Sequence, residues 1–178
     1  MKVNGDFSVR SLECYGSISI SGDAEVIEDI IVKGALDVNS LTVNGDFSVN
    51  GGARISSDLE CMGKVEIHGG IRVDGDLECL ELTIQGGLLV SGDTRINKNC
   101  EVKGGIKIEG DLEVGGNLII ELSGQGKSEI KGDIIINENL KVTREKGESN
   151  LIIYGEVKVN GEACLLYTSD AADDGESV

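Results

Sequence analysis

The sequence predicts an all-β fold, a single-stranded parallel β-helix with three sides and about 17–18 residues per turn. Three observations support this fold class. The motif NGDFSV occurs at residues 4–9 and again at 44–49, and the related motifs SGDAEV, DGDLEC and EGDLEV recur along the chain. A triplet of apolar, polar and apolar residues follows most corners, as expected for a short half-buried strand. Every third triplet begins 17 or 18 residues after its equivalent, until two longer turns late in the chain.

The triplets sort into three columns, one for each side of the helix. On the first side the strands begin at Phe7, Ala24, Leu41, Leu59, Leu77, Thr94, Leu112, Ile134 and Val157. On the second side they begin at Leu12, Ile30, Phe47, Val65, Leu82, Cys100, Leu118, Leu140 and Ala163. On the third side they begin at Ile18, Leu36, Ala53, Ile71, Leu88, Ile106, Ser128 and Leu151.

The first and third residues of each triplet are expected to point into the core, because strand side chains alternate. Of these inward positions only Thr94 and Ser128 carry polar side chains. A slip of one residue would bury charged side chains, so Leu77 should lie inside and Glu78 outside. Glycine at the corners is expected to supply the positive φ of sharp bends. Most parallel crossovers are right-handed, which favours right-handed winding, although the pattern also fits left-handed hexapeptide helices.

We expect residues 1–163 to form this β-helix as one domain. The repeat stops at residues 164–178, which read CLLYTSDAADDGESV. This segment resembles the in-frame translation of a sequencing-library adapter. We therefore interpret residues 164–178 as an artefact rather than native sequence, which would leave the natural C-terminus missing.

The composition argues against several classes of function. The formal net charge of −16 argues against nucleic acid as a partner, because the phosphate backbone would be repelled. The sequence contains no apolar run of the roughly 20 residues that a membrane helix needs and no secretory signal. We expect no catalytic residue, cofactor or metal ligand, since the single histidine, His68, leaves little for an acid–base or metal cluster.

Two local motifs have catalytic or nucleotide-binding interpretations that we consider weaker. His68 occupies a corner, where left-handed-helix acyltransferases place a general base, but solvent exposure explains it as well. The segment GQGKS at 124–128 suggests a phosphate loop, yet Glu121 stands where the first glycine is required and no helical pattern follows.

Four cysteines fall on inward positions. Cys61 and Cys79 belong to adjacent turns of the first side, and Cys14 and Cys100 also point inward. We expect buried, reduced thiols, while a disulfide between Cys61 and Cys79 is the geometrically acceptable alternative.

Acidic residues concentrate on the first side. Its corners carry Asp6, Asp23, Asp58, Asp76, Asp93, Asp111, Asp133 and Glu156, and its outward strand positions add Glu25, Glu60, Glu78 and Glu113. We interpret the aspartates as local Asx-type turns, in which a carboxylate accepts hydrogen bonds from nearby backbone N–H groups. A ladder of divalent cations is the alternative.

Two late insertions lie at one corner of consecutive turns. The segments 121–127 and 143–150 should form adjacent protruding loops, near the outward residues Ile119, Ile135 and Ile152. The loops either cover these isoleucines or form a lateral or partner contact with them.

The repeated units GDLEV, GGIKI and GKVEI, in an acidic, proline-free and cysteine-containing solenoid, resemble the bactofilins, polymer-forming cytoskeletal proteins of bacteria. The likeness is to the longer Gram-positive type and covers roughly residues 1–163. It implies a right-handed triangular β-helix, self-assembly without nucleotide, and a cytoplasmic or membrane-associated scaffold without catalytic residues. Membrane or cell-envelope partners would be contacted through terminal segments that this sequence lacks.

The leading functional hypothesis is therefore a structural protein that polymerises with itself, end to end. Its polymer contact would include Phe7 and Val9 of the first turn, because an uncapped strand edge templates further pairing. The alternatives are a hexapeptide-repeat acyltransferase-like enzyme, and a ligand-binding solenoid that uses the loops at 121–127 and 143–150.

Overall fold

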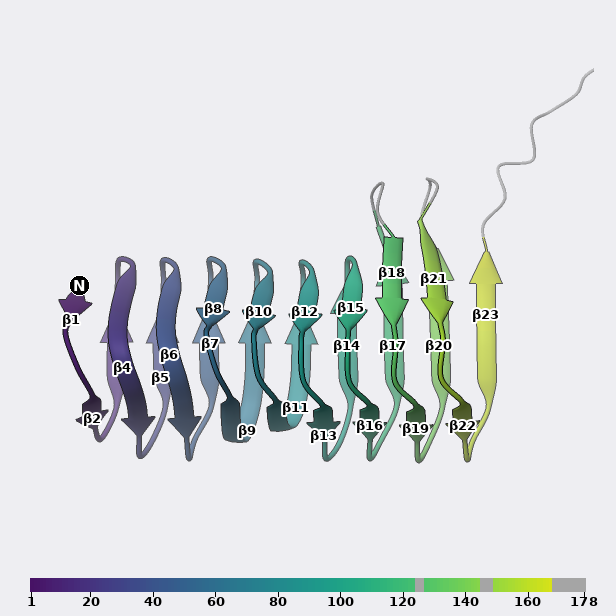
Figure 1. Cartoon of the computed structure of the whole chain (residues 1–178), viewed down its shortest axis with the longest axis horizontal. Coiled ribbons are helices and arrows are strands. Elements are labelled where there is room, and N and C mark those ends of the chain that lie inside the picture. The colour runs from purple at the N-terminus through teal and green to yellow at the C-terminus, as the bar shows by residue number, and fades with distance from the viewer. Residues whose placement is uncertain (124–126, 145–148, 168–178) are drawn as a thin grey trace, which may run out of the picture.

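The computed structural model describes residues 1–123, 127–144 and 149–167, which form 23 strands and no helix. Every strand pairing is parallel, and the strands wind as successive rungs along a rod (Figure 1). The predicted fold class, an all-β parallel solenoid, is confirmed.

Each side of the rod carries nine strand segments, and four long strands bend around a corner to serve two sides. The first side contains β2 (Phe7–Val9), the later halves of β4 (Ile18–Val26) and β6 (Leu36–Val43), the earlier halves of β9 (Leu59–Ile67) and β11 (Leu77–Ile84), β13 (Thr94–Ile96), β16 (Leu112–Val114), β19 (Ile134–Ile136) and β22 (Val157–Val159). The second side contains β3 (Leu12–Cys14), β5 (Ile30–Val32), β7 (Phe47–Val49), the later halves of β9 and β11, β14 (Cys100–Lys103), β17 (Leu118–Leu122), β20 (Leu140–Arg144) and β23 (Ala163–Tyr167). The third side contains β1 (Lys2–Val3), the earlier halves of β4 and β6, β8 (Ala53–Ile55), β10 (Ile71–Val73), β12 (Leu88–Val90), β15 (Ile106–Ile108), β18 (Lys127–Ile130) and β21 (Asn150–Ile153).

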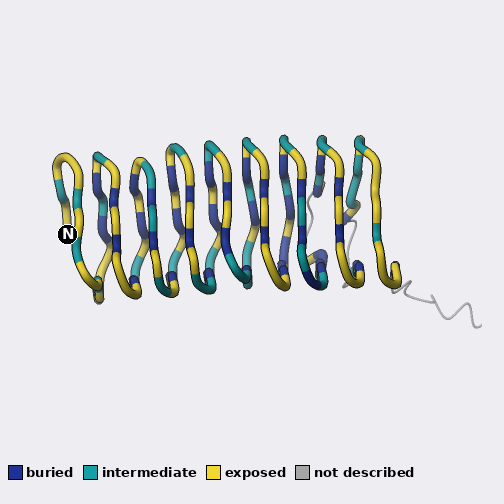
Figure 2. Tube along the Cα trace, turned by 90° about the horizontal axis from the view of Figure 1, so that it is seen from below, coloured by how far each residue is buried: buried dark blue, intermediate teal, exposed yellow. Residues whose placement is uncertain are grey.

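The register agrees with the three predicted columns. On the first side, for example, Leu77 pairs with Leu59 on one neighbour and with Thr94 on the other. Leu77 is buried and Glu78 is exposed, as the alternation requires. The core is therefore a stack of mainly aliphatic side chains along the rod axis. Buried positions recur along the trace on every interior turn (Figure 2).

The two polar inward residues differ in how their side chains are satisfied. Ser128 Oγ accepts the backbone N–H of Ile106 at 3.1 Å. Thr94 Oγ1 is buried and has no hydrogen-bond partner among the described residues. An unsatisfied buried hydroxyl costs stability, so Thr94 is a weak point of the stack.

The corner glycines act differently from the prediction. Positive φ occurs at only two described glycines, Gly5 and Gly104, so sharp bending does not explain the others. Instead, neighbouring rungs approach too closely for a side chain: a Cβ on Gly69 would lie 2.6 Å from the carbonyl oxygen of Gly51. The prediction that corner glycines supply positive φ is therefore wrong for most of them, because the constraint is contact between rungs.

The predicted adjacency of Cys61 and Cys79 is confirmed, and so is the predicted burial of these two thiols and of Cys100, whereas Cys14 on the first rung is only half-buried. Cys61 pairs in register with Cys79, and both are buried free cysteines, as is Cys100. Cys61 Sγ donates a hydrogen bond to Gly45 O at 3.3 Å. Burial raises the pKa of Cys61 to about 11 and that of Cys100 to about 12, and it raises the pKa of Cys79 as well.

These thiols should react in two classes. At pH 8 a thiol-specific reagent is expected to modify exposed Cys164 quickly and to leave Cys61, Cys79 and Cys100 unmodified until the chain unfolds, because the reactive thiolate is scarce and shielded. Raising the pH from 8 to 9 should still leave Cys61, Cys79 and Cys100 unmodified, because burial raises the pKa of each of these thiols. Mass analysis of labelled peptides checks this, and rapid labelling of Cys79 in the folded protein would contradict the buried register.

Candidate functional site

The two ends of the rod are the first candidate site, because there the core columns lose one neighbouring rung. Phe7 and Val9 of β2 are only half-buried, whereas their partners on the next rung, Ala24 and Val26, are 3% and 0% exposed. At the other end Val157 is 45% exposed, although its partner Ile134 is 2% exposed. Figure 2 shows this change of burial at both ends of the described rod.

The third side supplies a strand that the sequence pattern missed. β1 pairs with β4 through Lys2 and Ser19, so the first rung consists of β1, β2 and β3. The Met1 amino group donates to Ser17 O at 2.6 Å and holds this strand in place. The first-rung positions Phe7 and Val9 therefore lie beside Leu12 and Cys14, which are also half-buried.

The last described rung consists of β21, β22 and β23. β23 continues to Tyr167 and pairs with β20, including Cys164 with Lys141 and Leu165 with Val142. The strand therefore extends past residue 163 into the segment that resembles adapter sequence. Leu165 is 56% exposed, whereas Val142 beneath it is 4% exposed.

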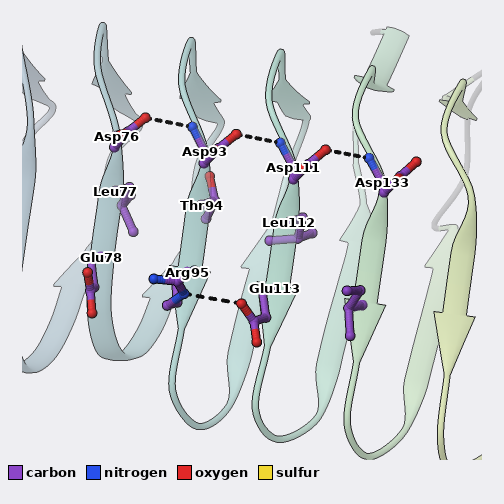
Figure 3. Close-up of a pocket in the computed structure, with 11 residues that line it drawn as sticks. Asp76, Leu77, Glu78, Asp93, Thr94, Arg95, Asp111, Leu112, Glu113 and Asp133 are labelled. Atoms are coloured by element: carbon purple, nitrogen blue, oxygen red, sulfur yellow. Dashed lines mark hydrogen bonds and ion pairs between the residues drawn. The ribbon is translucent and has the colours of Figure 1, made fainter.

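The second candidate site is a ladder of carboxylates along the corner between the third and first sides. Asp93 N–H donates to Asp76 Oδ1 at 2.8 Å, and Asp93 Oδ1 accepts the N–H of Asp111 at 2.9 Å (Figure 3). The same bond joins further neighbours at 2.8 to 3.1 Å: Asp6 to Asp23, Asp58 to Asp76, Asp111 to Asp133, and Asp133 to Glu156. Ser40 has no carboxylate and interrupts the series; Asp23 Oδ1 accepts Asn39 Nδ2 instead.

These bonds correct the interpretation of the aspartates as local Asx-type turns. Each acceptor lies 17 to 23 residues from its donor, on the neighbouring rung, and not within its own turn. The residue before each donor of this ladder is a glycine, and it leaves the space that the acceptor carboxylate of the preceding rung occupies, since a Cβ on Gly92 would overlap Asp76 Oδ1. The recurring Gly-Asp pair thus forms a hydrogen bond between one rung and the next.

A similar ladder runs along the corner between the first and second sides, and no motif pointed to it. Asn99 Oδ1 accepts the N–H of Asn117 at 2.9 Å, and Asn117 Oδ1 accepts the N–H of Asn139 at 3.2 Å. Asp29 and Asp46 play the same part earlier in the chain. The only sequence signal was polar residues recurring at the spacing of one turn.

The acids of the first side border a shallow groove. It is lined by the ladder from Asp76 to Asp133, by the outward residues Glu78, Arg95 and Glu113, and by Ile135. Arg95 Nε donates to Glu113 Oε2 at 3.1 Å, and this bond raises the pKa of Arg95 (Figure 3). Among the described residues, no three His, Cys, Asp or Glu side chains are placed to hold a metal ion.

The three isoleucines proposed as a lateral contact do not form one surface. Ile119 lies on the second side between Glu101 and Lys141, and Ile135 lies on the first side. Ile152 lies on the third side, next to Glu129. They share turns but face in three directions, so each is a single apolar residue rather than part of a patch.

His68 and the strands that flank the two late insertions lie at the predicted corner, between the second and third sides. His68 Nε2 lies 3.8 Å from Glu66 Oε1, with its side chain 42% exposed. The loop positions 124–126 and 145–148 lie outside the described residues, but the flanking strands stack, with Leu122 paired to Arg144 and Lys127 to Asn150. Ser128, the last residue of GQGKS, faces the core.

Comparison of the chain with protein-family models, curated proteins and solved structures finds no match. Within the described part of the chain there is no helix long and apolar enough to cross a membrane.

The ladder predicts different effects for two substitutions of Asp93. Asp93→Ala removes the acceptor of the Asp111 N–H and should lower the free energy of unfolding by about 1 kcal/mol, the net value of one hydrogen bond. Asp93→Asn keeps the acceptor and weakens repulsion between neighbouring carboxylates, so it should leave stability unchanged or raise it at low salt. Urea unfolding monitored by circular dichroism measures both variants.

Glu78→Ala is the matched control, because Glu78 is an exposed acid of the same side that lies outside the ladder. It should be close to neutral. Equal losses from Asp93→Ala and Asp93→Asn would show that charge, and not the inter-rung bond, determines the stability of this corner.

Proposed function

We propose that this chain is a structural protein rather than an enzyme: a β-helical protomer that assembles with further copies, end to end and without nucleotide. Its place would be that of a bactofilin-like scaffold in the bacterial cytoplasm or at the membrane. The observation that carries the proposal is the exposure of the core columns at the end rungs, which interior rungs bury completely.

Apolar burial favours such a contact. The core columns end in side chains that no further rung covers. These are Phe7, Val9, Leu12 and Cys14 at one end of the rod, and Val157 and Val159 at the other. A second rod placed on either end would cover these side chains as each interior rung covers the next. Burying apolar surface contributes roughly 25 cal/mol per Å², so several side chains buried together favour association.

Backbone pairing favours the same contact. Each end rung has a neighbour on only one side within the described chain, so half of its strand N–H and C=O groups face outward. Natural proteins protect such edges with proline, inward charges or a covering helix. The described end strands contain no proline and no inward charged residue, and no described helix covers them.

Charge directs growth along the axis. The first side carries the acids of the ladder and further outward glutamates, with Arg95 and Lys158 as its outward bases. Two such sides brought face to face would repel each other. Stacking on the ends avoids this contact.

The test compares two arginine substitutions on one strand. Phe7→Arg places a cation on the core column of the first rung, where a stacked copy would bury it without a partner. It should abolish or strongly reduce polymer recovered by sedimentation. Ser8→Arg adds the same charge at the neighbouring exposed position and should assemble as the unaltered chain does.

Assembly is measured with and without ATP or GTP, by sedimentation and negative-stain microscopy, and circular dichroism verifies that both variants fold. A strictly monomeric chain, or polymer that requires nucleotide, would overturn the proposed function. Equal assembly of the two variants would exclude the first rung as a contact.

A further inference from the structure

We infer that the third side of the rod binds the first side of a second copy, so that filaments pair laterally through two columns of opposite charge. This inference rests on the proposed end-to-end assembly and adds a separate contact between copies, at a different surface. It follows from the spacing of the outward charged residues on these two sides.

The third side carries a column of outward bases. Arg54 and Arg72 are in-register partners on adjacent rungs, and Lys107 follows two rungs later, with Leu89 between them. The side chains of Arg54, Arg72 and Lys107 are 60%, 51% and 43% exposed. These three residues, named here the basic column, are therefore accessible to a partner.

The bases of this column share carboxylates on their own chain. Asp74 Oδ1 lies 2.6 Å from Arg72 Nε, and Asp74 Oδ2 lies 4.0 Å from Arg54 Nη2. Lys107 shares Glu109 with a second lysine in the same way. Each group of two bases and one carboxylate keeps a net positive charge, which a carboxylate of a second copy can pair with.

The first side carries outward acids at the same spacing. Glu60 and Glu78 are in-register partners on adjacent rungs. Glu113 follows two rungs after Glu78, with Arg95 between them (Figure 3). A fourth acid, Glu25, lies two rungs before Glu60. These four acids are named here the acidic column; rungs are ~4.8 Å apart on both sides, so the two columns share one repeat.

The two columns match with the rods in either relative direction. With the rods parallel, Arg54, Arg72 and Lys107 face Glu60, Glu78 and Glu113; with the rods antiparallel, they face Glu78, Glu60 and Glu25. In neither alignment do two like charges of these outward strand positions face each other. The first side of a second copy is therefore a complementary partner for the third side.

The second side does not offer this complement. Among the described residues, its outward strand column contains the acids Glu13, Glu66 and Glu101 and the base Lys141. An acidic column placed on it would meet mainly like charges. The third side is thus the one that fits the acidic first side.

The contact should form between filaments and weaken with salt. One exposed ion pair contributes little, but every copy along a filament repeats the set, so the contributions accumulate. The Debye length falls from ~10 Å at ~0.1 M salt to ~3 Å at ~1 M salt. We therefore expect filaments of the full chain to pair at ~0.1 M salt and to separate at ~1 M salt.

Charge reversal tests the contact, with filament width measured by negative-stain microscopy. Arg54→Glu/Arg72→Glu should abolish pairing and leave single filaments, because two acidic sides then face each other. Lys98→Glu/Lys141→Glu is the matched control: it changes the net charge equally, at exposed positions outside the third side, and should pair as the unaltered chain does.

Mixing the two reversed surfaces identifies the partner. Glu60→Arg/Glu78→Arg filaments should not pair with one another, because two basic sides then meet. Separately assembled Arg54→Glu/Arg72→Glu and Glu60→Arg/Glu78→Arg filaments should pair when mixed, in either relative direction. Circular dichroism verifies folding, and Arg54→Gln/Arg72→Gln, which adds no carboxylate beside Asp74, should also lose pairing.

The failures are distinguishable. Pairing that increases with salt, persists in Arg54→Glu/Arg72→Glu, or is absent from the unaltered filaments at ~0.1 M salt would overturn the lateral contact and leave end-to-end assembly standing. Pairing that both reversals abolish and mixing does not restore would overturn the first side as the partner. Absence of any sedimenting polymer would overturn end-to-end assembly, and the lateral contact with it.

Discussion

The contact of each rung with the next is the interaction on which this structure depends. A single rung has three short strands and cannot bury its inward side chains by itself. Burial comes from the columns, as the change from 2% exposed Ile134 to 45% exposed Val157 shows. The corners follow the same constraint: glycines such as Gly69 are needed because the preceding rung lies too close for a Cβ, and the carboxylate of Asp76 is positioned to accept the N–H of Asp93.

The side-chain pattern was sufficient to predict the strands and their register, because alternation has a period of two and the repeat has a period of one turn. It correctly placed Leu77 inside, Glu78 outside and Cys61 beside Cys79. The role of the Gly-Asp pairs was not accessible in the same way. A glycine before an aspartate is typical of a local turn, and only the three-dimensional stack shows that the carboxylate accepts an N–H group 17 to 23 residues away. The asparagine ladder escaped notice because its residues share no recognisable motif, and β1 escaped notice because it is only two residues long.

The functional proposal extends the same interaction beyond one chain. Interior rungs satisfy their backbone and bury their apolar residues on both neighbours, while the end rungs do so on one. A further copy would meet apolar core columns and unpaired strand edges at the end of the rod, which are the groups that one rung already offers the next. The lateral surface differs from the ends of the rod, because its first side is acidic rather than apolar. Ile119, Ile135 and Ile152 lie on three different sides and form no apolar patch there.

The central claim is that assembled chains continue the stack of rungs along one axis. Fibre diffraction from aligned polymer tests it most directly, because strands perpendicular to the filament repeat every ~4.8 Å along it. The account predicts a strong reflection at about this spacing on the meridian, parallel to the filament axis. The same reflection on the equator would mean that the rods lie across the filament and associate through their sides, which would contradict assembly through the end rungs.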